Sequence, residues 1–237
     1  MILSFLADHN GTPESQLPRL DLIVRATAGL PPSGGRLGVL GGSYNPPTRA
    51  HLVLARAAVA EFNLHEVVFV LSELPPHKSL IGASIDERLK MMRLGTIALP
   101  FISVGLCTHG LFLDICVALR QVYPHHPELF FITGRDAAER ILTWHYEDPE
   151  EALASMFAAF QLLVFDRQGE LRLPNIPLFK KYASRIHSLT VSENLDHVSS
   201  SKVRERIRVG LSIRDLVPRE VAAFIEQNNI YTNLSGD

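Results

Sequence analysis

Short apolar runs alternate with segments of helical character along most of the chain. The apolar runs are rich in β-branched and aromatic residues and lie at Leu37–Leu40, Val67–Leu71, Ile102–Leu106, Leu129–Thr133 and Gln161–Phe165. The helical segments lie between most of them and near the end of the chain, at His51–Phe62, Arg88–Leu99, Leu111–Val122, Asp136–Trp144, Lys202–Val209 and Pro218–Gln227. Strands that alternate with helices form βαβ units, which build parallel sheets covered on both faces. The pattern therefore predicts the α/β fold class, as a doubly wound parallel sheet with C-terminal helices.

The first 35 residues do not share this pattern. They lack clear periodicity, and they end in Gly29–Gly35, a segment rich in glycine and proline that is typical of a linker. We therefore divide the chain into an N-terminal extension of unknown role, residues 1–35, and one domain, residues 36–237. A partner-binding arm is one hypothesis for the extension, and composition is its sole support.

Composition and charge exclude several classes of protein. The chain has 237 residues, of which 46% are hydrophobic and 20% charged, and this excludes disorder, collagen-like repeats and a coiled coil. Its formal net charge of −2 argues against nonspecific binding of nucleic acid, which requires a strong basic excess. A small anionic ligand is still allowed, because its site needs only a few local cations.

The cysteines and the lack of a long apolar run bear on the compartment. Cys107 and Cys116 form no C-x-x-C pair, so we expect reduced thiols in the cytoplasm and no zinc site. No run approaches the roughly 18 apolar residues of a membrane span, so we expect no membrane partner. The oligomeric state stays open, and a homo-oligomer is one alternative.

The loop after the first predicted strand carries the first candidate chemistry. It reads GGSYNPPTRAH from Gly41 to His51, at the carboxyl end of a strand, where open parallel sheets bind ligands. Gly41 and Gly42 permit a tight turn and a close approach of a ligand to the backbone. Thr48 is a good N-cap, and the helix that it starts offers free N–H groups to a phosphate. His51 lies one turn further and points to the same side; an ordinary loop with a surface histidine is the alternative.

Two further clusters follow predicted strands. The sequence LPPHK ends with His77 and Lys78, which a stiff Pro-Pro segment presents to a phosphate, and Arg88 downstream opens a helix. A plain surface loop is the alternative for this cluster. The second cluster, FITGRD, is a buried strand that ends in Gly134-x-Asp136, and Asp136 is also a candidate helix N-cap.

A fourth cluster, VSSSKVR, lies at Val198–Arg204 and precedes an apolar-periodic helix. Its three serines provide strong N-cap chemistry. Lys202 and Arg204 place two cations in the first helical turn, where the helix dipole makes positive charge unfavourable. A nearby polyanion would remove that penalty, so the segment predicts a triphosphate site.

These clusters, in this order, resemble the motifs of the nucleotidylyltransferase superfamily. GGSYNPPTRAH resembles its G-G-(S/T)-(F/Y)-(D/N)-P and (H/T)-x-G-H motifs, with Thr48 and His51 at the outer positions of the second and Ala50 at its usual glycine. VSSSKVR resembles I-S-S-T-x-I-R, with Ser200 and Arg204 at matching positions. PPHK before an arginine-initiated helix resembles the bacterial nicotinate-nucleotide adenylyltransferases in particular. The resemblance covers nearly all of the chain after the extension and implies a Rossmann-like fold.

The resemblance implies adenylyl transfer in NAD biosynthesis: the 5′-phosphate of a pyridine mononucleotide attacks the α-phosphorus of ATP and expels pyrophosphate. The implied catalytic residues are His51 at the α-phosphate, Thr48, Lys78 and Arg204. The implied nucleotide-binding residues are Gly41, Gly42, Ser43, Tyr44, Asn45, Gly134, Asp136, Ser199, Ser200 and Arg204. The implied substrate-binding residues are His77, Lys78 and Trp144, the last by stacking on the pyridine ring, with a core position as its alternative. Mg²⁺ would be carried by the ATP phosphates, because the sequence offers no carboxylate cluster for a protein site.

The identity of the acceptor is left open by one segment. Where the resembled enzymes usually carry Ser-Tyr-Thr-x-Asp-Thr, this chain has Gly110, Leu111 and Phe112 in place of Ser-Tyr-Thr, and Asp114 persists. Nicotinate and nicotinamide mononucleotide both remain candidates. Two further alternatives are a superfamily member that uses a different phosphorylated acceptor or CTP, and a regulatory module that binds nucleotides without turnover.

Overall fold

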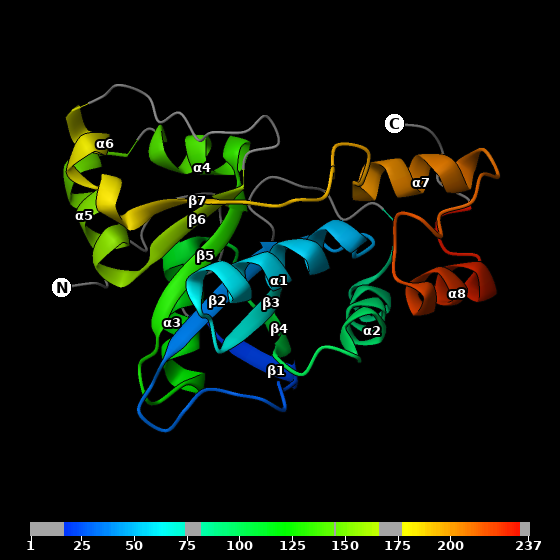
Figure 1. Cartoon of the computed structure of the whole chain (residues 1–237), viewed down its shortest axis with the longest axis horizontal. Helices are drawn as coiled ribbons and strands as arrows, with labels where there is room; N and C mark the ends of the chain where they lie inside the picture. Colours follow the sequence, from blue (N-terminus) through cyan, green and yellow to red (C-terminus); the bar gives the residue numbers. More distant parts are fainter. Residues whose placement is uncertain (1–16, 74–81, 145, 166–176, 233–237) are drawn as a thin grey trace.

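The computed structural model describes residues 17–73, 82–144, 146–165 and 177–232, and these form one central sheet with helices around it (Figure 1). The strands run in the order β1-β4-β3-β2-β5-β6-β7. Their bounds are β1 Leu20–Val24, β2 Arg36–Gly42, β3 Glu66–Ser72, β4 Ile102–Cys107, β5 Glu128–Gly134, β6 Gln161–Phe165 and β7 Ile186–Leu189. The helices are α1 Arg49–Phe62, α2 Ile85–Thr96, α3 Phe112–Val122, α4 Arg135–Leu142, α5 Pro149–Ala159, α6 Pro177–Lys181, the 3₁₀ helix η2 Ala183–Arg185, α7 Ser200–Arg208 and α8 Arg219–Asn228.

Apolar side chains cover both faces of this sheet, as buried parallel strands require. Alternate residues of one strand enter different cores: Phe131 of β5 packs with α3, α4 and α5, whereas its neighbours Phe130 and Ile132 pack with α1. A third core joins α2 to α7 and α8, which lie together beside the sheet (Figure 1). The predicted fold class, a doubly wound α/β sheet with C-terminal helices, is therefore confirmed.

Each predicted strand and helix corresponds to an element of the structure, with ends that differ by a few residues. The strand β1 was not predicted, and it lies within the first 35 residues, where it pairs antiparallel with β4 at the edge of the sheet. The helices α5 and α6 and the short strand β7 were also missed. The start of α5 carries standard signals, because Asp148 accepts from the backbone N–H of Glu151 at 2.9 Å and Pro149 occupies the first turn.

A buried polar network lies at the amino end of the sheet. The Glu66 carboxylate of β3 accepts from the Ser103 hydroxyl at 2.5 Å and from the Tyr123 hydroxyl. Ser103 Oγ in turn accepts from the backbone N–H of Ala26 at 2.8 Å. Burial, and then the neighbouring Glu66 carboxylate, raise the pKa of Tyr123. The network ties the segment after β1 to the middle of the sheet.

The strand order sets a switch point at the carboxyl ends of β2 and β5. From β2 the chain moves outward through β3 to β4 and then crosses to β5 on the other side of β2. Loops that leave the carboxyl ends of β2 and β5 therefore diverge, and open sheets bind ligands at such a switch point. Within the described residues, no helix has the length and apolar character needed to span a membrane.

Candidate active site

The loop between β2 and α1 is held in place by its own aromatic and polar side chains. Tyr44 has a φ of 43° and a buried ring that stacks on Phe69, with centroids 5.4 Å apart. Its hydroxyl donates to the carbonyl of Leu40, and its ring lies 5.0 Å from that of His51. The Tyr44 side chain is therefore used for packing and for holding the loop.

Thr48 and His51 form a reciprocal pair at the start of α1, where Thr48 is the N-cap. The Thr48 backbone N–H donates to His51 Nδ1 at 3.0 Å, and Thr48 Oγ1 lies 2.8 Å from the same nitrogen. Since Nδ1 accepts, the proton of the neutral ring sits on Nε2. Burial lowers the pKa of His51 to about 4, so at neutral pH the ring is uncharged and offers one N–H donor.

The start of α7 contacts this loop directly, although the two segments lie more than 150 positions apart in the sequence. The Ser200 hydroxyl donates to the carbonyl of Pro46 at 2.7 Å, and Arg204 Nη1 donates to the carbonyl of Asn45 at 2.8 Å. Ser199 is the N-cap of α7 and accepts from the backbone N–H of Lys202 at 3.1 Å. The structure thus brings the first and the fourth sequence clusters together.

The third cluster lies at the start of α4, directly after β5. Gly134 is the N-cap of α4, so the prediction that Asp136 is the N-cap is wrong. The reason is the backbone: Gly134 has the extended conformation of a cap, and Asp136 is already in the first helical turn with an exposed side chain. Gly41 and Gly42 end the neighbouring strand β2, and a Cβ on Gly41 or Gly134 would meet no atom within 4 Å.

Trp144 lies just after α4 with 41% of its surface exposed, so its predicted alternative as a core residue is wrong. His77 and Lys78 lie outside the described residues. Arg88 does not open its helix, since α2 begins at Ile85. It is instead 2% exposed, and its Nε donates to the carbonyl of Ala83 at 2.7 Å.

The start of α3 holds residues that depart from the resembled motif. Phe112, at a position where the resembled enzymes carry threonine, stacks on Phe131 with centroids 4.3 Å apart and belongs to the core. Asp114 is buried, its Oδ1 has no hydrogen-bond partner in the described part of the chain, and burial raises its pKa.

Two further features lie outside the predicted set. Tyr231 contacts the first loop through Asn45, and no local pattern in the sequence marks it.

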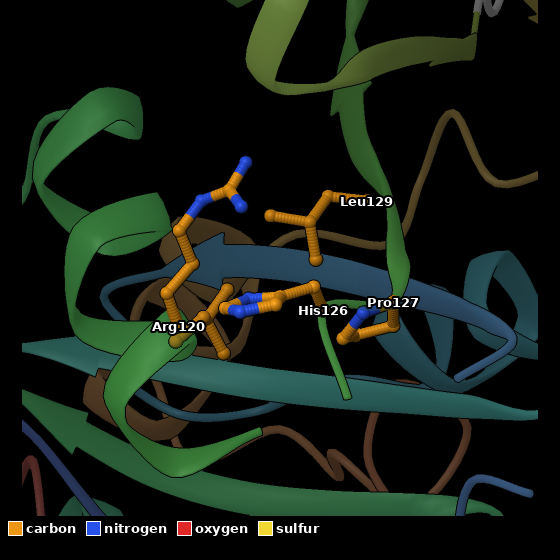
Figure 2. A pocket seen from close by; sticks show the side chains of 5 residues that line it. Arg120, His126, Pro127 and Leu129 are labelled. Atoms are coloured by element: carbon orange, nitrogen blue, oxygen red, sulfur yellow. The ribbon is translucent and has the colours of Figure 1, made fainter. Parts of the chain in front are cut away.

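The hollow in Figure 2 is lined by Leu119, Arg120, His126, Pro127 and Leu129. It lies where the chain enters β5, at the opposite end of that strand from the switch point. Among the described residues, no group of carboxylate, histidine and cysteine side chains is suited to a metal ion.

A doubly wound sheet whose first loop, half-buried histidine and basic helix start converge at the switch point defines a nucleotide-binding α/β protein. Residues 39–206 match the family model described as cytidylyltransferase-like. The chain is 34% identical to a probable nicotinate-nucleotide adenylyltransferase of Carboxydothermus hydrogenoformans, over 84% of this chain and 99% of the relative. A second relative so described, from a Thermoanaerobacter species, is 32% identical over 83% of this chain and 94% of its own length. The chain therefore belongs to the cytidylyltransferase-like family and, within it, to the nicotinate-nucleotide adenylyltransferases.

A solved structure shares the fold. The Plasmodium falciparum nicotinic acid mononucleotide adenylyltransferase complexed with NaAD superposes with a TM-score of 0.63 and 18% identity, over 83% of this chain and 97% of that one.

Proposed function

We propose that the chain transfers the adenylyl group of ATP, supplied as its magnesium complex, to a pyridine mononucleotide and releases pyrophosphate, a step of NAD biosynthesis. The observation that carries the proposal is the convergence of α7 on the β2–α1 loop at the switch point, with Ser200 and Arg204 bound to loop carbonyls. The names of the relatives supply the substrate class. We take nicotinate mononucleotide as the preferred acceptor on that ground.

The reaction needs little covalent chemistry from the protein. An oxygen of the acceptor 5′-phosphate forms a bond to the α-phosphorus of ATP, the bond from that phosphorus to the bridging oxygen breaks, and pyrophosphate carries away the electron pair. Catalysis is then a matter of holding the two phosphates in line and of stabilising charge on the α-phosphoryl oxygens.

His51 supplies the charge stabilisation in this proposal. Its Nε2–H is the free donor of a ring whose Nδ1 is engaged by Thr48. A low pKa keeps that donor neutral and constant across the working pH range. Thr48, Ser43 and the backbone of Gly42–Tyr44, with the N–H groups at the start of α1, hold the phosphates.

The β- and γ-phosphates lie toward α7 in this proposal. Arg204 binds the Asn45 carbonyl through Nη1, and its guanidinium has further N–H groups for a phosphate. Asp136 and Gly134, at the end of β5, face the nucleoside side. Trp144 offers an exposed ring to the acceptor pyridine, and the proposal assigns His77 and Lys78 to the acceptor phosphate.

A panel of acceptors tests the proposal directly. Nicotinate mononucleotide, nicotinamide mononucleotide and other phosphorylated acceptors are each mixed with ATP or with CTP, and pyrophosphate release is measured. We expect release with ATP and nicotinate mononucleotide. Release with another acceptor or with CTP would reassign the substrate within the superfamily. ATP binding without release from any mixture would favour the noncatalytic module.

A further inference from the structure

The side chain of Asn45 is a junction between three segments of the chain. It is 8% exposed, and its Oδ1 accepts from the backbone N–H of Ala83 at 3.2 Å and from the Tyr231 hydroxyl at 2.8 Å. A backbone N–H can only donate, so the contact with Ala83 fixes which end of the amide is the oxygen. The β2–α1 loop, the entry to α2 and the segment after α8 therefore meet at one atom.

The backbone at the entry to α2 packs so closely against Asn45 that residue 82 has to be glycine. Gly82 has a φ of +108°, and a Cβ on it would lie 2.9 Å from Asn45 Nδ2 and Oδ1 and 3.1 Å from Cε1 of Tyr231. Such distances leave no room for a side chain. The carbonyl of Ala83 is held in turn by the buried Arg88.

The backbone of Asn45 is held as well, because its carbonyl accepts from Arg204. Asn45 lies three residues before the Thr48 N-cap, and Thr48 positions the His51 ring. A shift of Asn45 therefore moves the donor that faces the α-phosphate.

We propose that Tyr231 is a positioning residue for adenylyl transfer, acting through Asn45; the proposal rests on the function proposed above. The Tyr231 ring is buried in the core formed by α2, α7 and α8. This packing does not depend on the contact that the hydroxyl makes. The hydroxyl reaches the loop through Asn45 Oδ1, and it sets the loop against the C-terminal helices. Displacements of about 1 Å cost about 10²-fold in rate when reacting groups must align.

Tyr231→Phe separates the two roles, because it keeps the ring in the core and removes the hydroxyl. We expect kcat to fall about five- to tenfold, the scale of one net hydrogen bond, while KM for ATP and for the mononucleotide changes less than about twofold. Tyr123→Phe is the matched control: it also removes a buried hydroxyl, at the amino end of the sheet. It should lower the temperature of unfolding at least as much and leave kcat unchanged.

A double-variant test shows whether Tyr231 acts through Asn45. In an Asn45→Ala background, Tyr231→Phe should have no further effect on kcat, because the partner of its hydroxyl is gone. An unchanged kcat in Tyr231→Phe, an equal kcat loss in Tyr123→Phe, or an undiminished loss in the Asn45→Ala background would each overturn the proposal. If the wild-type protein releases no pyrophosphate from any mixture, the proposed function fails and the positioning role fails with it.

Discussion

Replacing His51 with alanine removes the Nε2–H donor that we assign to the α-phosphate. Loss of one donor that stabilises charge in a transition state lowers kcat by about 10²- to 10³-fold. The variant also removes the acceptor of the Thr48 contacts at 3.0 and 2.8 Å, which costs about 1–2 kcal/mol of stability. We therefore expect a folded protein whose kcat for pyrophosphate release is at least about 10²-fold lower.

His187→Ala is the matched control for this variant. His187 is also partly buried, its Nε2 lies 2.7 Å from Gln161 Oε1, and burial lowers its pKa. It lies at the amino end of the sheet, away from the switch point, so its variant should keep wild-type turnover. A kcat for His51→Ala within a few-fold of wild type would remove His51 from the mechanism.

The low pKa of His51 predicts that the stability of wild type and that of His51→Ala depend differently on pH. The ring has a pKa of about 4 in the folded chain and an ordinary value of 6.5, so the unfolded chain binds more protons between those values. The contribution of the neutral His51 ring to the free energy of unfolding is fully present above pH 6.5. It is lost as the pH falls toward 4, and the loss is at most about 3 kcal/mol. Urea unfolding at pH 7, 6 and 5 should show a weaker loss of stability in His51→Ala than in wild type, and equal losses would contradict the assigned pKa.

Three further predictions concern residues in different parts of the molecule. Arg204→Ala should raise KM for ATP about tenfold or more, because a charged donor to the triphosphate is lost; an unchanged ATP constant would move the triphosphate elsewhere. Glu66→Ala should lower the free energy of unfolding in urea by about 3 kcal/mol, since it leaves the Ser103 and Tyr123 hydroxyls without their acceptor, and kcat should not change. Trp144→Ala should raise KM for the mononucleotide about two- to tenfold through lost stacking, with little change in unfolding temperature because the ring is exposed.

The part of the fold that the sequence predicts is the part with local signals. Buried parallel strands are continuous apolar runs, and β2 to β6 were found for that reason. The strand β1 is short, lies at the edge and follows no clear run, so its pairing with β4 had no local sign. The helix α5 carries a cap and a first-turn proline, so local signals for it are present in the sequence.

The residues of the candidate site likewise divide into those that local sequence signals predict and those that they do not. Its loops were found because glycine, proline, serine and cations gather after strands, and Thr48 is the helix cap that its residue type predicts. The contact between Tyr231 and Asn45 joins residues 186 positions apart. Such a pair is set by tertiary packing of α8 against α2. The sequence near either residue carries no local pattern that predicts the contact.

The two cations at the start of α7 differ in whether the protein itself compensates their charge, which the sequence alone does not show. Two positive charges at a helix N-terminus imply a compensating anion. The protein supplies one itself, since Lys202 pairs with Glu205 at 3.0 Å in the same helix. Arg204 differs, because its main contact is the Asn45 carbonyl, which satisfies a hydrogen bond and leaves the charge in place. Arg204 is the fifth residue of α7, which begins at Ser200, so it lies beyond the first turn in which the sequence places it. No carboxylate partner for Arg204 occurs in the described ranges, so its charge is the uncompensated one near this helix start. It faces the β2–α1 loop, where a triphosphate would neutralise it.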